Sequence, residues 1–100
     1  MVWHVPGNSL LAGEIHGLDA LFRWFERLHQ VTKGTFMLRE HDVLATDDHV
    51  IALSDMSSER DGHRVSVNVV SVMHFRDGRQ LERWFHPSDP LAYDVLLGGA

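Results

Sequence analysis

Residues 63–89 read HRVSVNVVSVMHFRDGRQLERWFHPSD and carry the strongest structural signal in this chain. Two runs rich in β-branched and aromatic residues flank the dipeptide Asp77-Gly78. This dipeptide favours a two-residue hairpin turn because both of its residues tolerate a positive φ. The first run alternates between a mostly apolar and a more polar set, which is typical of a strand with one face on a core. The segment therefore predicts two long antiparallel strands.

Further β-rich runs complete a sheet. A second Asp-Gly pair, Asp61-Gly62, predicts a hairpin between the run from residue 63 and the strand before it. The other expected strands are 1–5, 35–45 and 49–60. The strand 63–76 would be about 45 Å long at the usual rise of about 3.3 Å per residue. Such a strand normally bends, and a bent sheet with one covering helix leaves a conical cavity.

One amphipathic helix is predicted from Gly17 to Lys33. Its apolar residues recur at helical spacing and are expected to face the concave side of the sheet; they are Leu18, Leu21, Phe22, Phe25 and Leu28. Before it, residues 6–17 contain three glycines without a clear period, and we expect either a simple connector or a loop over a pocket mouth. Asp89-Pro90 is a favourable start for a short terminal helix over residues 91–97.

Composition indicates a single globular domain over residues 1–100, with 44% hydrophobic and 23% charged residues. The net charge of −5 argues against a nucleic-acid partner, because it repels phosphate backbones. The chain has no cysteine, which excludes thiolate chemistry and makes the cytoplasm the simpler expected location. The first residues do not resemble a signal peptide, and no apolar run approaches the length of about 20 residues that a membrane span needs.

Motifs for cofactors and metals are absent from the sequence. We find no glycine-rich nucleotide loop, no H-E-x-x-H and no G-x-S-x-G nucleophile motif. His74 and His86 fall on neighbouring strands, but the sequence offers no third ligand beside them. We therefore expect neither a cofactor nor a metal.

Three segments carry a family resemblance. They are WHVPGNSLLAGEIHG at 3–17, HDVLATDDHVIAL at 41–53 and VMHFRDGRQLERWFHPSDP at 72–90. Together they resemble the SnoaL-like branch of the ketosteroid isomerase and nuclear-transport-factor-two-like superfamily. The resemblance implies an α+β fold in which a curved antiparallel sheet wraps around the amphipathic helix as a cystatin-like cone. It also implies a pocket for a small hydrophobic molecule and, usually, a homodimer.

The resemblance also implies candidate catalytic residues. His4 takes the position of the general-base aspartate of the steroid isomerases, and histidine changes its charge near neutral pH, so His4 would be the base. Ser71 takes the position of their protonated aspartate and would donate one hydrogen bond to an oxyanion. One neutral donor is a weak stabiliser, so any catalysis should be slow.

The activity itself stays open at this point. The resemblance fits an acid/base isomerase, cyclase or hydrolase acting on an apolar or polyketide-like ligand. The alternative is a non-catalytic ligand binder or a homodimerising interaction module. Superfamily members usually begin with one or two helices before the strand that holds Trp3, whereas this chain starts at that strand. Either the reading frame begins short or the cone is without part of its lid.

The last strand has two possible orientations. The resemblance favours Leu81, Arg83 and Phe85 facing inward, which would put Arg83 in the cavity and make Trp84 an outer dimer anchor. The reverse orientation would make Glu82, Trp84 and His86 a polar pocket wall. With the first orientation, the expected ligand contacts are Trp3, Phe22, Phe25, Met73, Arg83 and Phe85.

Overall fold

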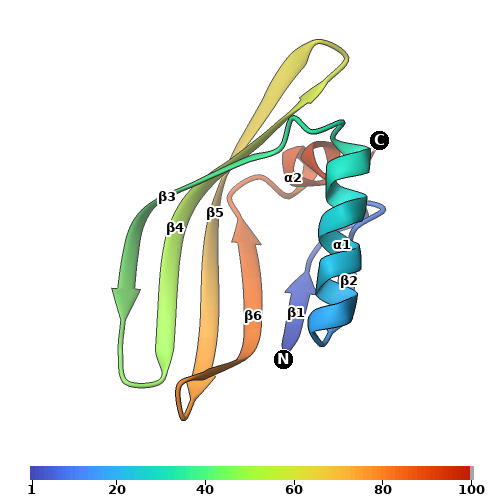
Figure 1. Ribbon diagram of the computed structural model, residues 1–100. Helices are drawn as coiled ribbons and strands as arrows, with labels where there is room; N and C mark the ends of the chain where they lie inside the picture. The colour runs from blue at the N-terminus through green and yellow to red at the C-terminus, as the bar shows by residue number, and fades with distance from the viewer. Residues whose placement is uncertain (100) are drawn as a thin grey trace.

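The computed structural model describes residues 1–99 as two helices packed on one curved, six-stranded sheet (Figure 1). The elements are β1 Val2–Val5, β2 Gly13–His16, α1 Leu18–Val31, β3 Met37–Ala45, β4 His49–Arg60, β5 His63–Arg76, β6 Arg79–Pro87 and α2 Pro90–Leu96. The strand order is β2-β1-β6-β5-β4-β3, so β2 and β3 form the two open edges. The predicted fold, a curved sheet with a covering helix and a short terminal helix, is confirmed.

Both predicted Asp-Gly hairpins form. Asp61 and Gly62 have φ values of 53° and 80°, and Asp77 and Gly78 have φ values of 52° and 75°. Two consecutive positive φ angles are characteristic of the tight turn whose twist matches that of the flanking strands. These turns set the register of β5 against both of its neighbours.

The N-terminal part of the sheet differs from the expectation in two ways. Residues 13–16, expected to lie in a loop, form the edge strand β2, which pairs with β1 through Trp3 opposite Ile15. In addition, β1 runs parallel to β6, with Trp3 opposite Arg83, so the sheet is mixed rather than antiparallel throughout. Neither pairing can be predicted from sequence patterns. Strands of four residues are too short to show a period, and no turn connects two strands from opposite ends of the chain.

The core lies between the helices and one side of the sheet, which we call the inner face; the opposite side is the outer face. The buried apolar cluster comprises Val5, Leu11, Ile15, Leu21, Leu28, Met56, Val67, Val69, Phe85, Tyr93, Leu96 and Leu97. Burial alternates along β4 and β5, as expected for strands packed on one side only. Both described helices contribute to this cluster, so both cover the inner face.

The packed stripe of α1 differs from the prediction. Leu21 and Leu28 are buried, but Leu18 and Phe22 are each 61% exposed. Trp24 packs against the core instead, so the inward residues follow the spacing of Leu21, Trp24, Phe25 and Leu28. The predicted and observed stripes share Leu21, Phe25 and Leu28. Packing against the sheet buries the stripe that contains Trp24 rather than the one that contains Phe22. Within residues 1–99, neither helix is long and apolar enough to cross a membrane.

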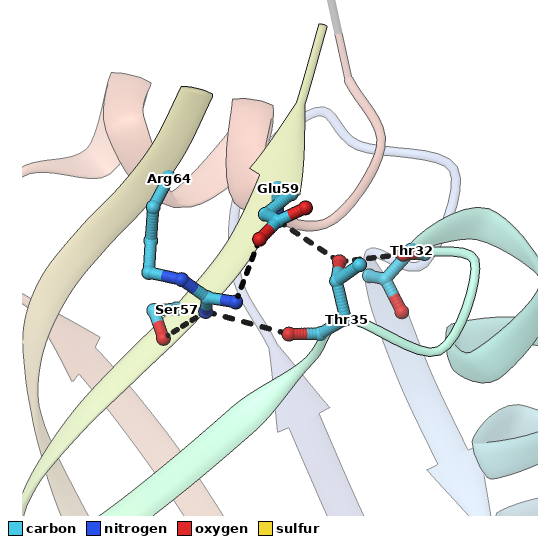
Figure 2. A network of polar contacts seen from close by, with 5 residues as sticks. All are labelled: Thr32, Thr35, Ser57, Glu59 and Arg64. Atoms are coloured by element: carbon cyan, nitrogen blue, oxygen red, sulfur yellow. Dashed lines mark hydrogen bonds and ion pairs between the residues drawn. The ribbon is translucent and has the colours of Figure 1, made fainter. Parts of the chain in front are cut away.

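A polar network holds the connection between α1 and β3 against the β4–β5 hairpin (Figure 2). The Arg64 guanidinium donates to the Ser57 hydroxyl at 2.7 Å and to the Thr35 carbonyl at 3.4 Å. The Thr35 hydroxyl accepts from the Glu59 amide at 2.9 Å and donates to the Thr32 carbonyl at 2.6 Å. This network positions Phe36 and the start of β3 beside α1.

Candidate functional site

A cavity of about 240 Å³ lies among α1, α2 and the inner face of the sheet. It is lined by Trp3, Trp24, Phe25, Leu28, Phe36, Leu38, Met56, Arg83, Phe85, Tyr93 and Leu97. These residues come from four strands, both helix regions and the α1–β3 connection, so the cavity is a product of the whole fold. Among the described residues that line it, only Arg83 and Tyr93 bring strongly polar groups.

Aromatic side chains form one wall of the cavity around Trp3. Its ring makes edge-to-face contacts with Trp24, Phe25 and Phe85 at centroid distances of 6.4, 5.8 and 5.5 Å. The Trp3 indole N–H donates to Gln80 Oε1 and that of Trp24 to the Leu11 carbonyl, both at 2.9 Å. Because these hydrogen bonds satisfy the indole N–H groups, the wall presents apolar ring surface to the cavity.

Arg83 is the charged group of the cavity, and its side chain is only 12% exposed. Its guanidinium carbon lies 4.9 Å from the ring centroids of both Trp3 and Phe85, within the range of a cation–π attraction. Nη2 donates to the Ser71 hydroxyl at 3.2 Å and lies 3.6 Å from Glu40 Oε1. Nε is buried and makes no hydrogen bond within residues 1–99.

Burial disfavours the charged form of both polar groups. Burial lowers the pKa of Arg83 below its ordinary value, while the neighbouring Glu40 opposes that change. Burial raises the pKa of the Tyr93 phenol above its ordinary value of 10.0, against the opposing effect of the Arg83 charge. Arg83 is still a cation near neutral pH, because a guanidinium loses its proton only far above that range, and the Tyr93 hydroxyl is neutral there.

The cavity brings together four of the six predicted ligand contacts: Trp3, Phe25, Arg83 and Phe85. Ser71, predicted as an oxyanion donor, is fully buried behind Arg83 and bonds to its guanidinium. Met73 is buried and pairs with Arg83 on β5, but it does not line the cavity. Phe22 also lies outside the lining, on the exposed side of α1.

His4 lies on the opposite side of the sheet from Ser71. It follows Trp3 on β1, and consecutive strand residues point to opposite faces. Its Nε2 lies 2.8 Å from a Glu82 carboxylate oxygen, its Nδ1 lies 3.4 Å from Glu14, and its ring stacks on Trp84 at 5.3 Å. Both ring nitrogens thus face carboxylates, and the structure does not join His4 and Ser71 into one site.

The orientation of β6 is the first of the two alternatives. Arg83 and Phe85 line the cavity, whereas Trp84 stacks on His4 at the outer face. Sequence reasoning missed Tyr93, whose position on the short helix α2 showed no site pattern. It also missed Glu40, because the approach of β3 to Arg83 depends on how the sheet curves.

A pair of histidines, His49 and His74, lies at one end of the sheet. His49 and His74 stack at 4.9 Å, and His49 Nδ1 lies 2.9 Å from Asp48 Oδ1. This hydrogen bond lowers the pKa of the exposed Asp48 carboxyl. Over residues 1–99, no group of three or more His, Cys, Asp or Glu side chains is arranged to hold a metal ion.

Residues 1–83 match the SnoaL-like domain family. The chain belongs to this family. The SnoaL-like chain is 36% identical to Bal32a from a soil-derived mobile gene cassette, covering 96% of this chain and 74% of that one with a TM-score of 0.86. Among curated proteins, none matches it.

Two further solved structures share the fold. A protein with a cystatin-like fold from Xanthomonas campestris is 25% identical, with a TM-score of 0.86 over 99% of this chain and 77% of its own. TerC, co-crystallised with polyporic acid, is 18% identical, with a TM-score of 0.80 over 96% of this chain and 75% of its own. At this identity, the likeness to TerC concerns the fold alone.

Proposed function

We propose that this SnoaL-like domain binds a small, predominantly apolar molecule in the cavity beneath α1. The observation that carries the proposal is an apolar, aromatic-walled cavity of about 240 Å³ with one buried cation in its lining. Small-molecule sites typically combine mostly apolar walls with a few polar groups that orient the ligand. The co-crystallisation of TerC with polyporic acid is consistent with a small-molecule pocket in this fold.

Binding, rather than turnover, is the function that we favour. Arg83 and Tyr93 are donors and suit negative charge on a ligand. Proton abstraction needs a base within reach of the substrate, and the lining of the described cavity contains no histidine and no carboxylate. Glu40 beside Arg83 is the remaining candidate base, and product formation from a bound carbonyl compound would favour an acid/base enzyme instead.

Tryptophan fluorescence offers a direct test. Trp3 and Trp24 line the cavity, whereas Trp84 lies on the outer face, so a Trp84→Phe protein reports only on the cavity. We expect saturable quenching of this protein by 2-naphthamide, a neutral aromatic probe. A further Phe25→Ala change should weaken binding about fivefold or more, because it removes an aromatic wall contact.

Phe22→Ala is the matched control. Phe22 lies on the same helix and is also partly exposed, but it does not line the cavity, so binding should be unchanged. Absence of saturable quenching, or equal effects of the two alanine substitutions, would refute the proposed binding site.

We also propose that two copies of the domain associate through the outer face. Four apolar residues lie in register across four strands: Leu44 opposite Ile51, Ile51 opposite Val72, and Val72 opposite Trp84. Both described helices pack on the inner face, and Leu44 remains 56% exposed. Because a bare apolar sheet face favours association, sedimentation at micromolar concentration should give the mass of a dimer.

Three expectations from composition stay predictions. They are a cytoplasmic location, the absence of a nucleic-acid partner and the absence of a membrane partner. Each follows from the cysteine-free sequence, its net charge of −5 or its lack of a long apolar run.

A further inference from the structure

The charge of Arg83 is incompletely matched by the protein. Its single acidic neighbour among the contacts of the described chain is Glu40, at 3.6 Å, whereas charge-assisted hydrogen bonds are about 2.7–2.9 Å long. Glu40 is itself 40% exposed, so solvent weakens its attraction. The Ser71 hydroxyl is a neutral hydrogen-bond acceptor. The Trp3 and Phe85 rings attract the cation, but they accept no hydrogen bond in the plane of the guanidinium. Burying a cation without a close anionic partner costs free energy, and a bound anion would reduce this cost.

The guanidinium retains free donors. Nη2 serves both Ser71 and Glu40, while Nε is buried and makes no hydrogen bond to residues 1–99. The planar fork of an arginine fits the two oxygens of a carboxylate, which makes this group a better partner than a single carbonyl. Tyr93 lines the same cavity, and burial keeps its phenol neutral and able to donate. The polar part of the cavity therefore offers donors and one positive charge.

The remaining walls limit the body of the ligand. A volume of about 240 Å³ lies below the roughly 300 Å³ at which drug-sized pockets begin. The contacts around Trp3 present ring edges and faces suited to another aromatic ring. A body of one or two rings is thus the appropriate size and chemistry.

We propose that the ligand is a small aromatic or alicyclic carboxylate whose anionic group is bound by Arg83. This inference rests on the proposed binding function and specifies its ligand class. Glu40 competes for the same guanidinium, and the ligand's carboxylate displaces it from Arg83 on binding.

Two probes of equal shape test the charge preference. We expect 2-naphthoate to bind the Trp84→Phe protein about tenfold or more tightly than 2-naphthamide, measured by fluorescence quenching and calorimetry. The substitution Arg83→Met keeps much of the side-chain length but removes the charge, and it should bring the affinity ratio of the two probes close to one. Equal affinities in the parent protein, or a preference that persists in Arg83→Met, would overturn the inference.

A second variant keeps the test informative if Arg83→Met fails to fold. Glu40→Gln removes the competing carboxylate at a partly exposed position, and it should increase the preference for 2-naphthoate severalfold. Asp42→Asn is the matched control, because it makes the same charge change two residues further along β3, at another exposed position. Equal changes in both variants would show a general charge effect and would count against direct competition at Arg83.

The two proposals fail in different ways. If neither probe quenches in a manner that depends on Phe25, the cavity is not a binding site, and the ligand class is refuted with it. If 2-naphthamide binds and 2-naphthoate binds no better, the binding function stands and only the carboxylate assignment is refuted.

Discussion

Gly7 shows how a single residue ties the two ends of the chain together. Its φ is 98°, and a Cβ at this position would overlap the Asp94 carboxylate. Asp94 is buried on α2 and accepts a hydrogen bond from the Asn8 amide at 2.9 Å. The close approach of backbone and carboxylate therefore requires glycine, because any side chain would be both strained and crowded.

We expect Gly7→Ala to destabilise the domain more than Gly13→Ala. Gly13 also has a positive φ, of 124°, but a Cβ there meets no atom within 4 Å. The difference in the free energy of unfolding, measured by urea denaturation, should be about 1–3 kcal/mol, the usual cost of overpacking. Similar losses for the two variants would show that backbone strain alone explains the need for glycine.

Tyr93 predicts an alkaline limit to stability. Burial raises its pKa above the ordinary value of 10.0, so the folded state holds its proton at a pH where the unfolded state has lost it. The free energy of unfolding should then fall as pH rises above about 10 and should be unaffected by this group below that value. Tyr93→Phe should reduce the slope of this fall between about pH 10 and about pH 11.5.

Absorbance of the tyrosinate provides an independent check, because Tyr93 is the single tyrosine of the chain. The folded protein should show no tyrosinate until well above the pH at which free tyrosine ionises. Ordinary titration in the folded state, together with parallel stability curves for parent and variant, would contradict the burial of the phenol.

At the scale of elements, α2 depends on its first residues. Asp89 accepts a hydrogen bond from the Ala92 amide at 3.1 Å, and Pro90 occupies the first helical position. This confirms the helix start predicted from the Asp-Pro pair. Tyr93 on this helix and Leu97 directly after it both line the cavity. The N-cap that stabilises the helix therefore also helps to position the candidate site.

Asp89→Ala should lower the free energy of unfolding by about 0.5–2 kcal/mol, because an orphan helix N–H loses its acceptor. Asp89→Asn retains a side-chain oxygen and should restore most of this loss. Thermal or urea unfolding measures both, and equal stabilities of the alanine and asparagine variants would exclude a capping role.

The elements that were predicted correctly are those with local sequence signals. The hairpins of β4, β5 and β6 depend on Asp-Gly turns and on alternation within each strand, and both signals are local. The stripe of α1 was predicted only in part, because Phe25 fits either of two overlapping apolar faces. Packing of Trp24 against the core selected the observed face, and Phe22 was left exposed.

At the scale of the whole molecule, the two faces of the sheet have different roles. The inner face holds the cavity, and the outer face carries the apolar row that includes Trp84. If the outer face joins two copies, a charge placed on it should separate them without altering the cavity. Val70 is suitable for this test, because it lies on the outer face opposite Leu53 and is 37% exposed.

Val70→Lys should shift the sedimenting species from dimer to monomer while leaving the affinity for 2-naphthamide unchanged. Ser66→Lys is the matched control, since Ser66 lies on the same strand and face but opposite Ser57 rather than an apolar residue. A dimer that survives Val70→Lys, or a monomeric parent protein, would remove the outer face as the site of association.

The sequence by itself determined the hairpins, the existence of both helices and the family, and the family resemblance favoured the inward direction of Arg83 and Phe85, which the residues alone left open. Each of these features depends on short-range spacing or on motifs that are present in the sequence. The prediction placed Trp3 and His4 in one site, but consecutive residues of a strand point to opposite faces, and the cavity contains Trp3 and not His4.

Only the tertiary structure decided the pairing of β1 with β6, the formation of β2 and the composition of the cavity. Trp3 and Gln80 are 77 positions apart in sequence, yet their hydrogen bond orients the ring at the centre of the aromatic wall. Such contacts leave no periodic trace, because they depend on the curvature of the sheet and on where each helix packs. The site is therefore set by long-range packing, while the strands and helices that build it are set by local sequence.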